Sequence, residues 1–366
     1  MADNVINLKD KQRHKERIEG AKWAYATRRV PRNGGWQLSK RNVRPQAGDL
    51  VLATVTRLGH HKRLELPDGR RARLFVGDEV VVAYGNRYAP DQFESIVPEN
   101  LGACHLVAAG GIASQMVFKH DAVKNPTRLS PVGLLTDAEG RVANLHDFSL
   151  RPRQTLGKMP PVMAVVGSSM NSGKTTTAAS LIRGLTQAGL KVHAGKVTGT
   201  GAGGDIWFFK DAGARQVMDF LDAGHPTTYL LPAGRVKESF LTILSHLAES
   251  DPDIIVLEVA DGLYQAETVD LLASQTFNRH VDTVLFAALD SLGGVHGVER
   301  LRSWKVNVVA VSGLITRSPL SMREFQDACD LPVLGSAGLE SPAVEMHLRE
   351  WLSRFDASRI QKGGQR

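Results

Sequence analysis

The sequence of 366 residues contains little cysteine and no long apolar run. Its two cysteines, Cys104 and Cys329, do not form a metal-type pair, and so few thiols favour a reducing compartment. No apolar run approaches the roughly 18 residues that a membrane-spanning helix requires. The first residues also lack the basic-then-apolar pattern of a secretory signal. We therefore expect a cytoplasmic protein with no membrane partner.

Acidic residues are scarce at the N-terminal end. Residues 1–74 contain 18 lysines and arginines against 7 aspartates and glutamates, whereas the rest of the chain contains 27 against 31. Trp23, Tyr25 and Trp36 are interleaved with these cations. Cations bind phosphates and aromatic rings stack on bases, so residues 9–73 predict a nucleic-acid partner. The alternative is a solvated tail that docks on the acidic remainder of the chain.

The length suggests two domains rather than one. Polar, basic residues with a helix expected from Asp10 to Thr27 open the chain, and short strand-like runs separated by turn signals follow. Closely spaced short strands predict a small, mainly-β, barrel-like domain. The expected divisions are a partly helical or flexible arm (1–46), the β-rich domain (47–150), a linker (151–160), a second domain (161–356) and a flexible tail (357–366).

Strand-like and helical runs alternate in the second domain. This alternation predicts an α/β fold with a mostly parallel sheet and helices on both faces. The expected strands are 162–166, 192–197, 228–231, 254–259, 281–288, 306–311 and 332–335. The expected helices are 174–188, 238–249, 267–279 and 322–329.

A loop of small residues joins the first expected strand to the first expected helix of this domain. Small residues let backbone N–H groups turn toward phosphate oxygens, and the helix N-terminus adds its positive dipole end. Lys174 is expected to bridge the β and γ phosphates, and the Thr175 hydroxyl to ligate Mg²⁺. The expected nucleotide-binding residues are Gly167, Ser168, Ser169, Asn171, Ser172, Gly173, Lys174, Thr175 and Thr176.

The spacing of this loop departs from the usual P-loop by one residue. Gly167 begins a G-x₅-G-K-T run, and Ser168 stands where Gly or Ala is usual. The alternative interpretation is a Gly/Ser-rich strand-to-helix turn that binds no ligand. The strand before it, the helix after it and the Gly-Lys-Thr-Thr run favour a nucleotide site.

The lengthened loop, followed by a second strand ending Gly195-Lys196-Val197-Thr198-Gly199, resembles the dethiobiotin synthetase group of P-loop proteins. The molybdopterin-guanine-dinucleotide accessory proteins have a similar loop. The P-loop domain of the D-glutamate N-acetyltransferase family is a more distant resemblance. Together the resemblances cover roughly residues 161–355 and imply a P-loop NTPase domain that uses ATP and Mg²⁺.

The resemblance also implies roles for two residues outside the loop. Lys196 matches the lysine that reaches the transferred phosphate, and Glu258 matches the acidic residue that closes a buried strand next to Mg²⁺. Asp205 follows a glycine-dense loop after the second strand, and the carboxyl ends of parallel strands face one crevice. The expected catalytic residues are therefore Lys174, Lys196 and Glu258. The expected metal ligands are Thr175, Glu258 and Asp205.

Two departures from the dethiobiotin synthetases leave the nucleobase open between ATP and GTP. Ser169 and Met170 stand where those proteins carry an Asp in the loop, and a base-reading Asn is absent from residues 311–315. The pattern as a whole predicts an ATP-dependent ligase or transferase that activates or phosphorylates a small-molecule carboxylate or similar acceptor. A homodimer is compatible with it.

Two other functions stay open. The first is a nucleotide-regulated protein that binds nucleic acid through its basic N-terminal region. The second is an N-acyltransferase whose P-loop holds an acyl-CoA, by analogy with the D-glutamate N-acetyltransferase family.

Overall fold

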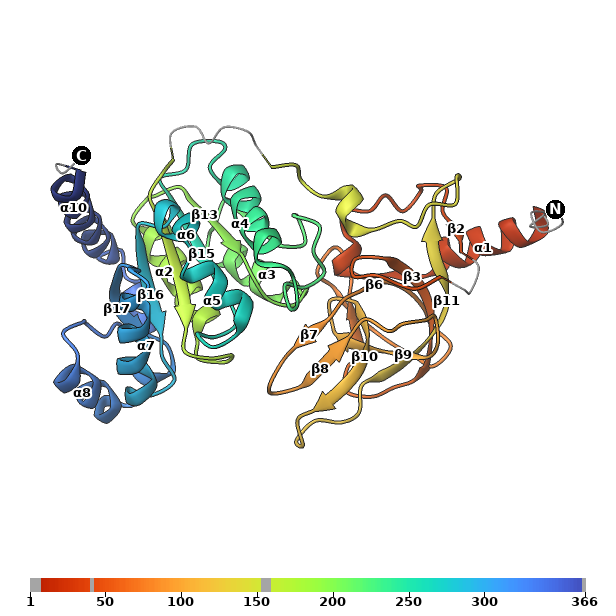
Figure 1. Cartoon of the computed structure of the whole chain (residues 1–366), viewed down its shortest axis with the longest axis horizontal. Helices are drawn as coiled ribbons and strands as arrows, with labels where there is room; N and C mark the ends of the chain where they lie inside the picture. Colours follow the sequence, from red (N-terminus) through yellow and green to blue (C-terminus); the bar gives the residue numbers. More distant parts are fainter. Residues whose placement is uncertain (1–7, 40–42, 153–158, 364–366) are drawn as a thin grey trace. The chain divides into compact units, whose positions relative to one another are not determined.

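The computed structural model describes residues 8–39, 43–152 and 159–363 (Figure 1). Parts of the expected arm, linker and tail (1–7, 40–42, 153–158 and 364–366) lie outside the described residues. The chain forms two compact units, which we describe separately. The β unit comprises residues 1–150, 200–204 and 220–229, and the α/β unit comprises residues 151–199, 205–219 and 230–366.

The β unit begins with a helix that is shorter than expected. Helix α1 spans Leu8–Gly20 and is followed by strand β1 (Lys22–Trp23) and the 3₁₀ helix η1 (Tyr25–Thr27), so the prediction of one helix from Asp10 to Thr27 is wrong in its second half. The Trp23 and Tyr25 side chains are buried, and β1 pairs in parallel with a strand of the sheet. Burial of two large aromatic side chains outweighs the local helix propensity.

The β unit is built on one nine-stranded sheet and a separate hairpin. Five of its strands pair in a closed ring in the order β6-β3-β11-β9-β10, because β10 also pairs with β6. The inward face buries aliphatic side chains such as Val51, Val82 and Leu106. The strands not yet named are β2 (Gln37–Leu38), β3 (Leu50–Arg57), β4 (Arg63–Glu65), β5 (Arg71–Arg73), β6 (Glu79–Tyr84), β7 (Arg87–Tyr88), β8 (Phe93–Ile96), β9 (Cys104–Ala108), β10 (Ile112–Lys119) and β11 (Thr127–Thr136), followed by η2 (Leu145–Phe148).

The α/β unit contains a six-stranded sheet whose strands all run parallel, in the order β14-β13-β15-β12-β16-β17. The mixed α/β architecture expected from the alternation of strands and helices is confirmed. Its strands are β12 (Val162–Gly167), β13 (Val192–Lys196), β14 (Gln216–Asp219), β15 (Ile254–Glu258), β16 (Thr283–Ala287) and β17 (Val308–Ser312). Its helices are α2 (Lys174–Gln187), α3 (Gly204–Asp211), α4 (Ala233–Leu247), α5 (Ala266–Leu272), α6 (Gln275–His280), α7 (Ser291–Ser303), η3 (Leu314–Arg317), α8 (Pro319–Ala328), α9 (Ser336–Glu340) and α10 (Val344–Gly363).

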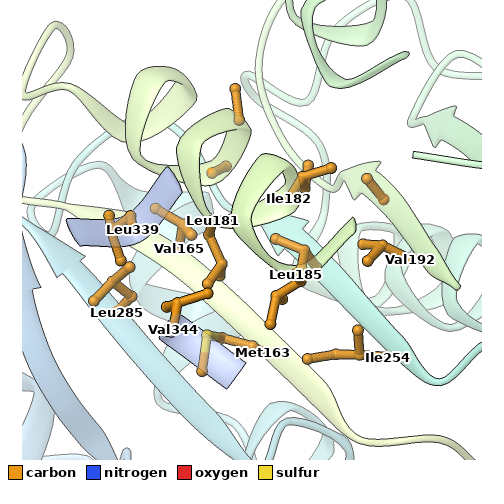
Figure 2. Packing of buried hydrophobic residues seen from close by; sticks show 14 of the residues in the cluster. Met163, Val165, Leu181, Ile182, Leu185, Val192, Ile254, Leu285, Leu339 and Val344 are labelled. Carbon is orange, nitrogen blue, oxygen red and sulfur yellow. The ribbon is translucent and has the colours of Figure 1, made fainter. Parts of the chain in front are cut away.

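Helix α2 is held over the middle of this sheet by a continuous apolar core (Figure 2). Leu181, Ile182 and Leu185 of α2 point toward the side chains of the central strands, such as Met163 and Ile254. All of these side chains are fully buried. The core therefore fixes the start of α2, and with it the loop that precedes the helix, relative to the carboxyl ends of the strands.

Three expected elements of the α/β unit differ in the structure. The predicted strand 228–231 is wrong, and β14 forms the edge of the sheet instead. Most residues of β14 are only half-buried, so its sequence does not need the apolar run that marks a buried strand. Residues 332–335 form one isolated bridge, Val311↔Val333, rather than a strand. The helix expected over 267–279 is broken into α5 and α6, because Ser274 accepts from the Phe277 N–H and starts a new helix.

Candidate functional site

The loop between β12 and α2 has the backbone that a phosphate cradle needs. Gly173 has φ 99° and is the N-cap of α2, and its carbonyl accepts from the Thr177 N–H at 2.9 Å. This left-handed conformation strains any residue with a side chain. A Cβ on Gly167 would lie 2.3 Å from Ser172 Oγ, so glycine is also required where the strand enters the loop. The loop conformation thus explains why both of these positions in the G-x₅-G-K-T run are glycine.

Lys174 is the first residue of α2 and reaches back across the loop. Only 6% of it is exposed, and its Nζ donates to the carbonyl oxygens of Ser169 at 2.8 Å and Asp261 at 2.5 Å. Burial lowers the pKa of Lys174, while the charges of Glu258 and Asp261 oppose this shift. The ammonium group is therefore fixed inside the loop, where it can face phosphate oxygens.

Lys196 and Glu258 end two neighbouring strands, and the register of β13 and β15 places them opposite each other. Lys196 Nζ lies 3.4 Å from Glu258 Oε1 and also pairs with the Asp205 carboxylate at the start of α3. Burial alone would lower the pKa of Lys196, but the charges of Asp205 and Glu258 raise it well above its usual value. Lys196 therefore stays a cation throughout the physiological range.

Glu258 connects this cation to the P-loop. The strand register places Val165 of β12 opposite Glu258, and Thr175 Oγ1 lies 3.3 Å from Glu258 Oε1. The Glu258 side chain is 1% exposed, and its Oε2 is buried with no hydrogen-bond partner among the residues that the structure describes. Burial raises the pKa of Glu258, opposed by Lys196. A buried carboxylate oxygen without a partner is costly unless a further cation or donor meets it.

The oxygen atoms gathered here fit Mg²⁺. One hydroxyl (Thr175) and two carboxylates (Glu258 and Asp205) are hard oxygen donors, and Mg²⁺ is commonly held by one or two carboxylates together with waters and substrate phosphates. Within residues 8–39, 43–152 and 159–363, no group of three or more His, Cys, Asp or Glu side chains forms a cage for a metal ion. The hydroxyl and the two carboxylates fit an ion whose remaining ligands are phosphates and waters.

The structure brings together the residues that were expected to act. Lys174, Lys196, Glu258, Thr175 and Asp205 lie within one connected set of contacts. The remaining loop residues surround it: Gly167 and Ser172 are buried, Ser168, Ser169 and Gly173 are half-buried, and Asn171 and Thr176 are exposed. Their roles in nucleotide binding stay predictions.

Several positioning contacts were not anticipated. The Thr268 Oγ1 accepts from the Asp261 N–H at 3.1 Å and donates to the Ala260 carbonyl at 2.7 Å, which fixes the loop that holds Lys174. The Leu314 N–H donates to the Ser172 carbonyl at 3.0 Å. None of these contacts has a sequence signal, because residues of ordinary type make them: Thr268 lies seven and eight residues from its two partners, and Leu314 lies far from Ser172 along the chain.

No protein-family description matches the sequence, and no curated protein matches it. Among solved structures, the chain is similar to the signal recognition particle receptor FtsY of Elizabethkingia anophelis in complex with GDP, at 20% identity, 52% coverage of this chain, 60% of that one and a TM-score of 0.34. It is also similar to chloroplast FtsY of Physcomitrella patens, at 20% identity, 52% coverage of this chain, 62% coverage of that one and a TM-score of 0.31. A third similar structure is the kinase domain of the Escherichia coli tyrosine kinase ETK, at 16% identity, 42% coverage of this chain, 66% coverage of that one and a TM-score of 0.33. The chain spans less than two thirds of these structures, and the fold described above rests on its own strand pairings.

None of the helices in the described part of the chain is both long and apolar enough to span a membrane. The expected cytoplasmic location stays a prediction.

Proposed function

We propose that the α/β unit binds a nucleoside triphosphate with Mg²⁺, ATP in the first place, and transfers or cleaves its γ-phosphate. One observation carries the proposal. A buried carboxylate, Glu258, lies between the P-loop hydroxyl of Thr175 and the cation Lys196, and one of its oxygens is unpartnered within the described residues. A carboxylate that only ends a strand does not need to be buried, paired with a cation and left with one oxygen that has no hydrogen-bond partner.

Each residue has a distinct task in this proposal. Lys174, after the loop that follows β12, and Lys196, at the end of β13, place two cations at the carboxyl edge of the sheet, where they stabilise charge that develops on phosphate oxygens. Thr175 and Glu258 hold and orient the metal, and Asp205 holds Lys196 in position. Bound Mg²⁺ supplies charge neutralisation and a fixed geometry for the phosphates.

The acceptor that we propose is a small-molecule carboxylate or a similar oxyanion, as in the dethiobiotin synthetases. Lys196 supports this choice, because its position at the carboxyl end of β13 lets one cation face both a phosphate and an anionic acceptor. A homodimer, GTP in place of ATP, and acyl-CoA as a ligand stay open predictions of the sequence.

The role of Lys196 is tested by measuring ADP formation from Mg·ATP for the full chain and for Lys196→Ala. We expect turnover to fall by about 100-fold or more, the usual effect of losing a group that stabilises transition-state charge. The binding of Mg·ATP should change much less. Lys210→Ala is the matched control, because Lys210 is an exposed lysine of α3, the same helix that carries Asp205. Wild-type turnover in Lys196→Ala would remove Lys196 from the mechanism.

A further inference from the structure

The β4–β5 hairpin of the β unit carries an unusual concentration of positive charge. Five basic side chains, all exposed, occur within twelve residues: Lys62, Arg63, Arg70, Arg71 and Arg73. None of them forms an ion pair with the described part of the chain. The two acidic residues of the hairpin segment offset only part of this charge, because five basic side chains stand against two acidic ones. Glu65 is buried, and only Asp68, which accepts from the Arg70 N–H in the turn, is exposed.

The strand register makes this concentration costly. Arg63 and Arg73 are directly opposite each other in the hairpin, and both side chains are exposed. A second pair of exposed arginines, Arg57 and Arg128, is directly opposite across β3 and β11. Like charges at such positions destabilise a sheet. An anion placed between the members of each pair would remove this repulsion.

The hairpin is a rigid carrier for these charges. Leu64, Ala72 and Leu74 point to its other side and are 0%, 3% and 0% exposed, so the strands are anchored in the core of the β unit. The Leu74 N–H also donates to the Lys62 carbonyl at 3.0 Å. The arginines are therefore presented from a packed scaffold and not from a solvated tail.

An exposed aromatic ring lies next to the arginine pair. Phe75 directly follows β5 and is 58% exposed, and Val76 after it is 64% exposed. Lys22, which pairs with the Asp78 carboxylate, lies 5.7 Å from the centre of the Phe75 ring and donates to the Arg73 carbonyl at 3.1 Å, so the cation beside the ring that has no ion pair within the described residues is Arg73. A ring open to solvent beside cations can stack on an unpaired base, which a duplex does not offer on its outside.

We propose that Arg63, Arg73 and Phe75 form a binding surface for single-stranded nucleic acid, with the Arg57–Arg128 pair as a second phosphate contact. The arginines bind backbone phosphates and Phe75 stacks on a base, so binding is sequence-tolerant and strongly dependent on salt. The surface lies entirely in the β unit and does not depend on the nucleotide proposed for the α/β unit. It also narrows the expected nucleic-acid contact to the β4–β5 hairpin and Phe75, and adds Arg128, which lies outside residues 9–73.

Fluorescence anisotropy of the full chain with a labelled single strand of about 20 nucleotides tests this surface. We expect affinity to fall steeply between about 50 and 200 mM salt, and the single strand to bind more tightly than the duplex of the same sequence. Phe75→Ala should weaken single-strand binding about fivefold or more and leave duplex binding unchanged.

Charge reversal separates a binding role from a structural one. Arg73→Glu replaces the repulsive pair with an attractive one, so we expect equal or higher thermal stability and about tenfold weaker oligonucleotide binding. Arg63→Glu/Arg73→Glu restores like charges, so its stability should return toward the wild-type value while its affinity falls further. Arg323→Glu, on an exposed arginine of α8, is the control for the same change in net charge.

Three outcomes would overturn the proposal. The first is no binding of single strands at low salt. The second is equal affinity of wild type, Arg73→Glu and Phe75→Ala. The third is binding to vesicles of anionic phospholipid without any binding to single strands, which would assign the surface to a membrane.

Discussion

Glu258 is the buried carboxylate that we propose as a metal ligand. Its carboxylate is 1% exposed, is close to Lys196 and Thr175, and keeps one oxygen unpartnered within the described residues. Glu258→Gln removes the charge and keeps the shape of the side chain, and Lys196 keeps Asp205 as an ionic partner.

We expect Glu258→Gln to weaken the binding of Mg·ATP by about tenfold or more, since losing even a supporting partner of a bound metal has an effect of this size. Binding of ATP without Mg²⁺ should change little. Calorimetric titration of both forms measures the difference. Glu267→Gln is the control, because Glu267 is also a buried glutamate of the α/β unit. An unchanged dependence on Mg²⁺ in Glu258→Gln would exclude Glu258 as a ligand.

His61 of the β unit predicts a dependence of stability on pH. Burial, and then the positive charge of Arg87, lower the pKa of His61 from 6.5 to about 3. Its Nε2 lies 2.9 Å from the Val107 carbonyl oxygen and 3.2 Å from Arg87 Nη1. The folded protein therefore holds the neutral ring at pH values where the unfolded chain binds a proton.

Because the pKa of His61 is lower in the folded than in the unfolded protein, the free energy of unfolding decreases as the pH falls. The contribution of neutral His61 to stability is complete above about pH 6.5 and is lost as the pH falls toward 3, with a slope of up to ~1.4 kcal/mol per pH unit. Urea unfolding between pH 7 and pH 5 should show a smaller loss of unfolding free energy in His61→Gln than in the wild type. An identical pH dependence of the two proteins would contradict this assignment.

Among the elements, the segment from β12 through the loop to α2 is held both by its own backbone conformation and by its packing on the sheet. Gly173 has the left-handed backbone that ends the loop, and the apolar face of α2 fixes the helix on the sheet (Figure 2). Gly173 is therefore, with Gly167, one of the two glycines on which the loop conformation depends.

We expect Gly173→Ala to lower stability by about 1–2 kcal/mol and to abolish nucleotide binding, because the alanine strains the backbone and its Cβ would lie 3.0 Å from Gly313 Cα. Gly189→Ala is a matched control: Gly189 has φ 92°, follows α2, and has no atom within 4 Å of the added Cβ. It should lose similar stability and keep nucleotide binding. Loss of binding in both variants would show that strain anywhere in α2 is sufficient.

The elements also show how far prediction from sequence reaches. The runs that became β12, β15 and α2 are predictable, because buried parallel strands are largely apolar and the helix starts at a phosphate-loop motif. Strand β13 is also predicted, although it contains His193 and ends in Lys196. Strand β14 is not predictable, because an edge strand with half-buried residues has no such pattern. The candidate site was predictable where strand ends carry charge, but the Thr268 contact that supports it depends on tertiary packing.

At the scale of the whole molecule, the two units are not consecutive in the sequence. Residues 200–204 and 220–229 belong to the β unit, although the residues before and after each of these segments in the sequence belong to the α/β unit. The Gly203 N–H donates to Glu65 Oε2 at 2.9 Å in a buried contact, and the Gly201 N–H donates to the Pro226 carbonyl at 2.9 Å. The glycine-dense loop is therefore anchored and not free.

We expect Glu65→Ala to lower the free energy of unfolding by about 1–3 kcal/mol, because a buried N–H loses its acceptor. Amide exchange at Gly203 should become much faster. Hydrogen exchange read out by mass spectrometry or NMR measures this directly, with the exposed Glu139→Ala as control. Unchanged protection of Gly203 would mean that the loop is held by its other contacts alone.

The central claim is that the α/β unit binds a nucleoside triphosphate through Lys174. Calorimetric titration of the full chain with Mg·ATP, Mg·GTP and acetyl-CoA, for wild type and Lys174→Ala, tests it most directly. We expect saturable binding of Mg·ATP to the wild type and none to Lys174→Ala, because the variant loses the ammonium held inside the loop. Binding of neither triphosphate to the wild type, or equal binding to the variant, would contradict it, and binding of acetyl-CoA instead would favour acyl transfer.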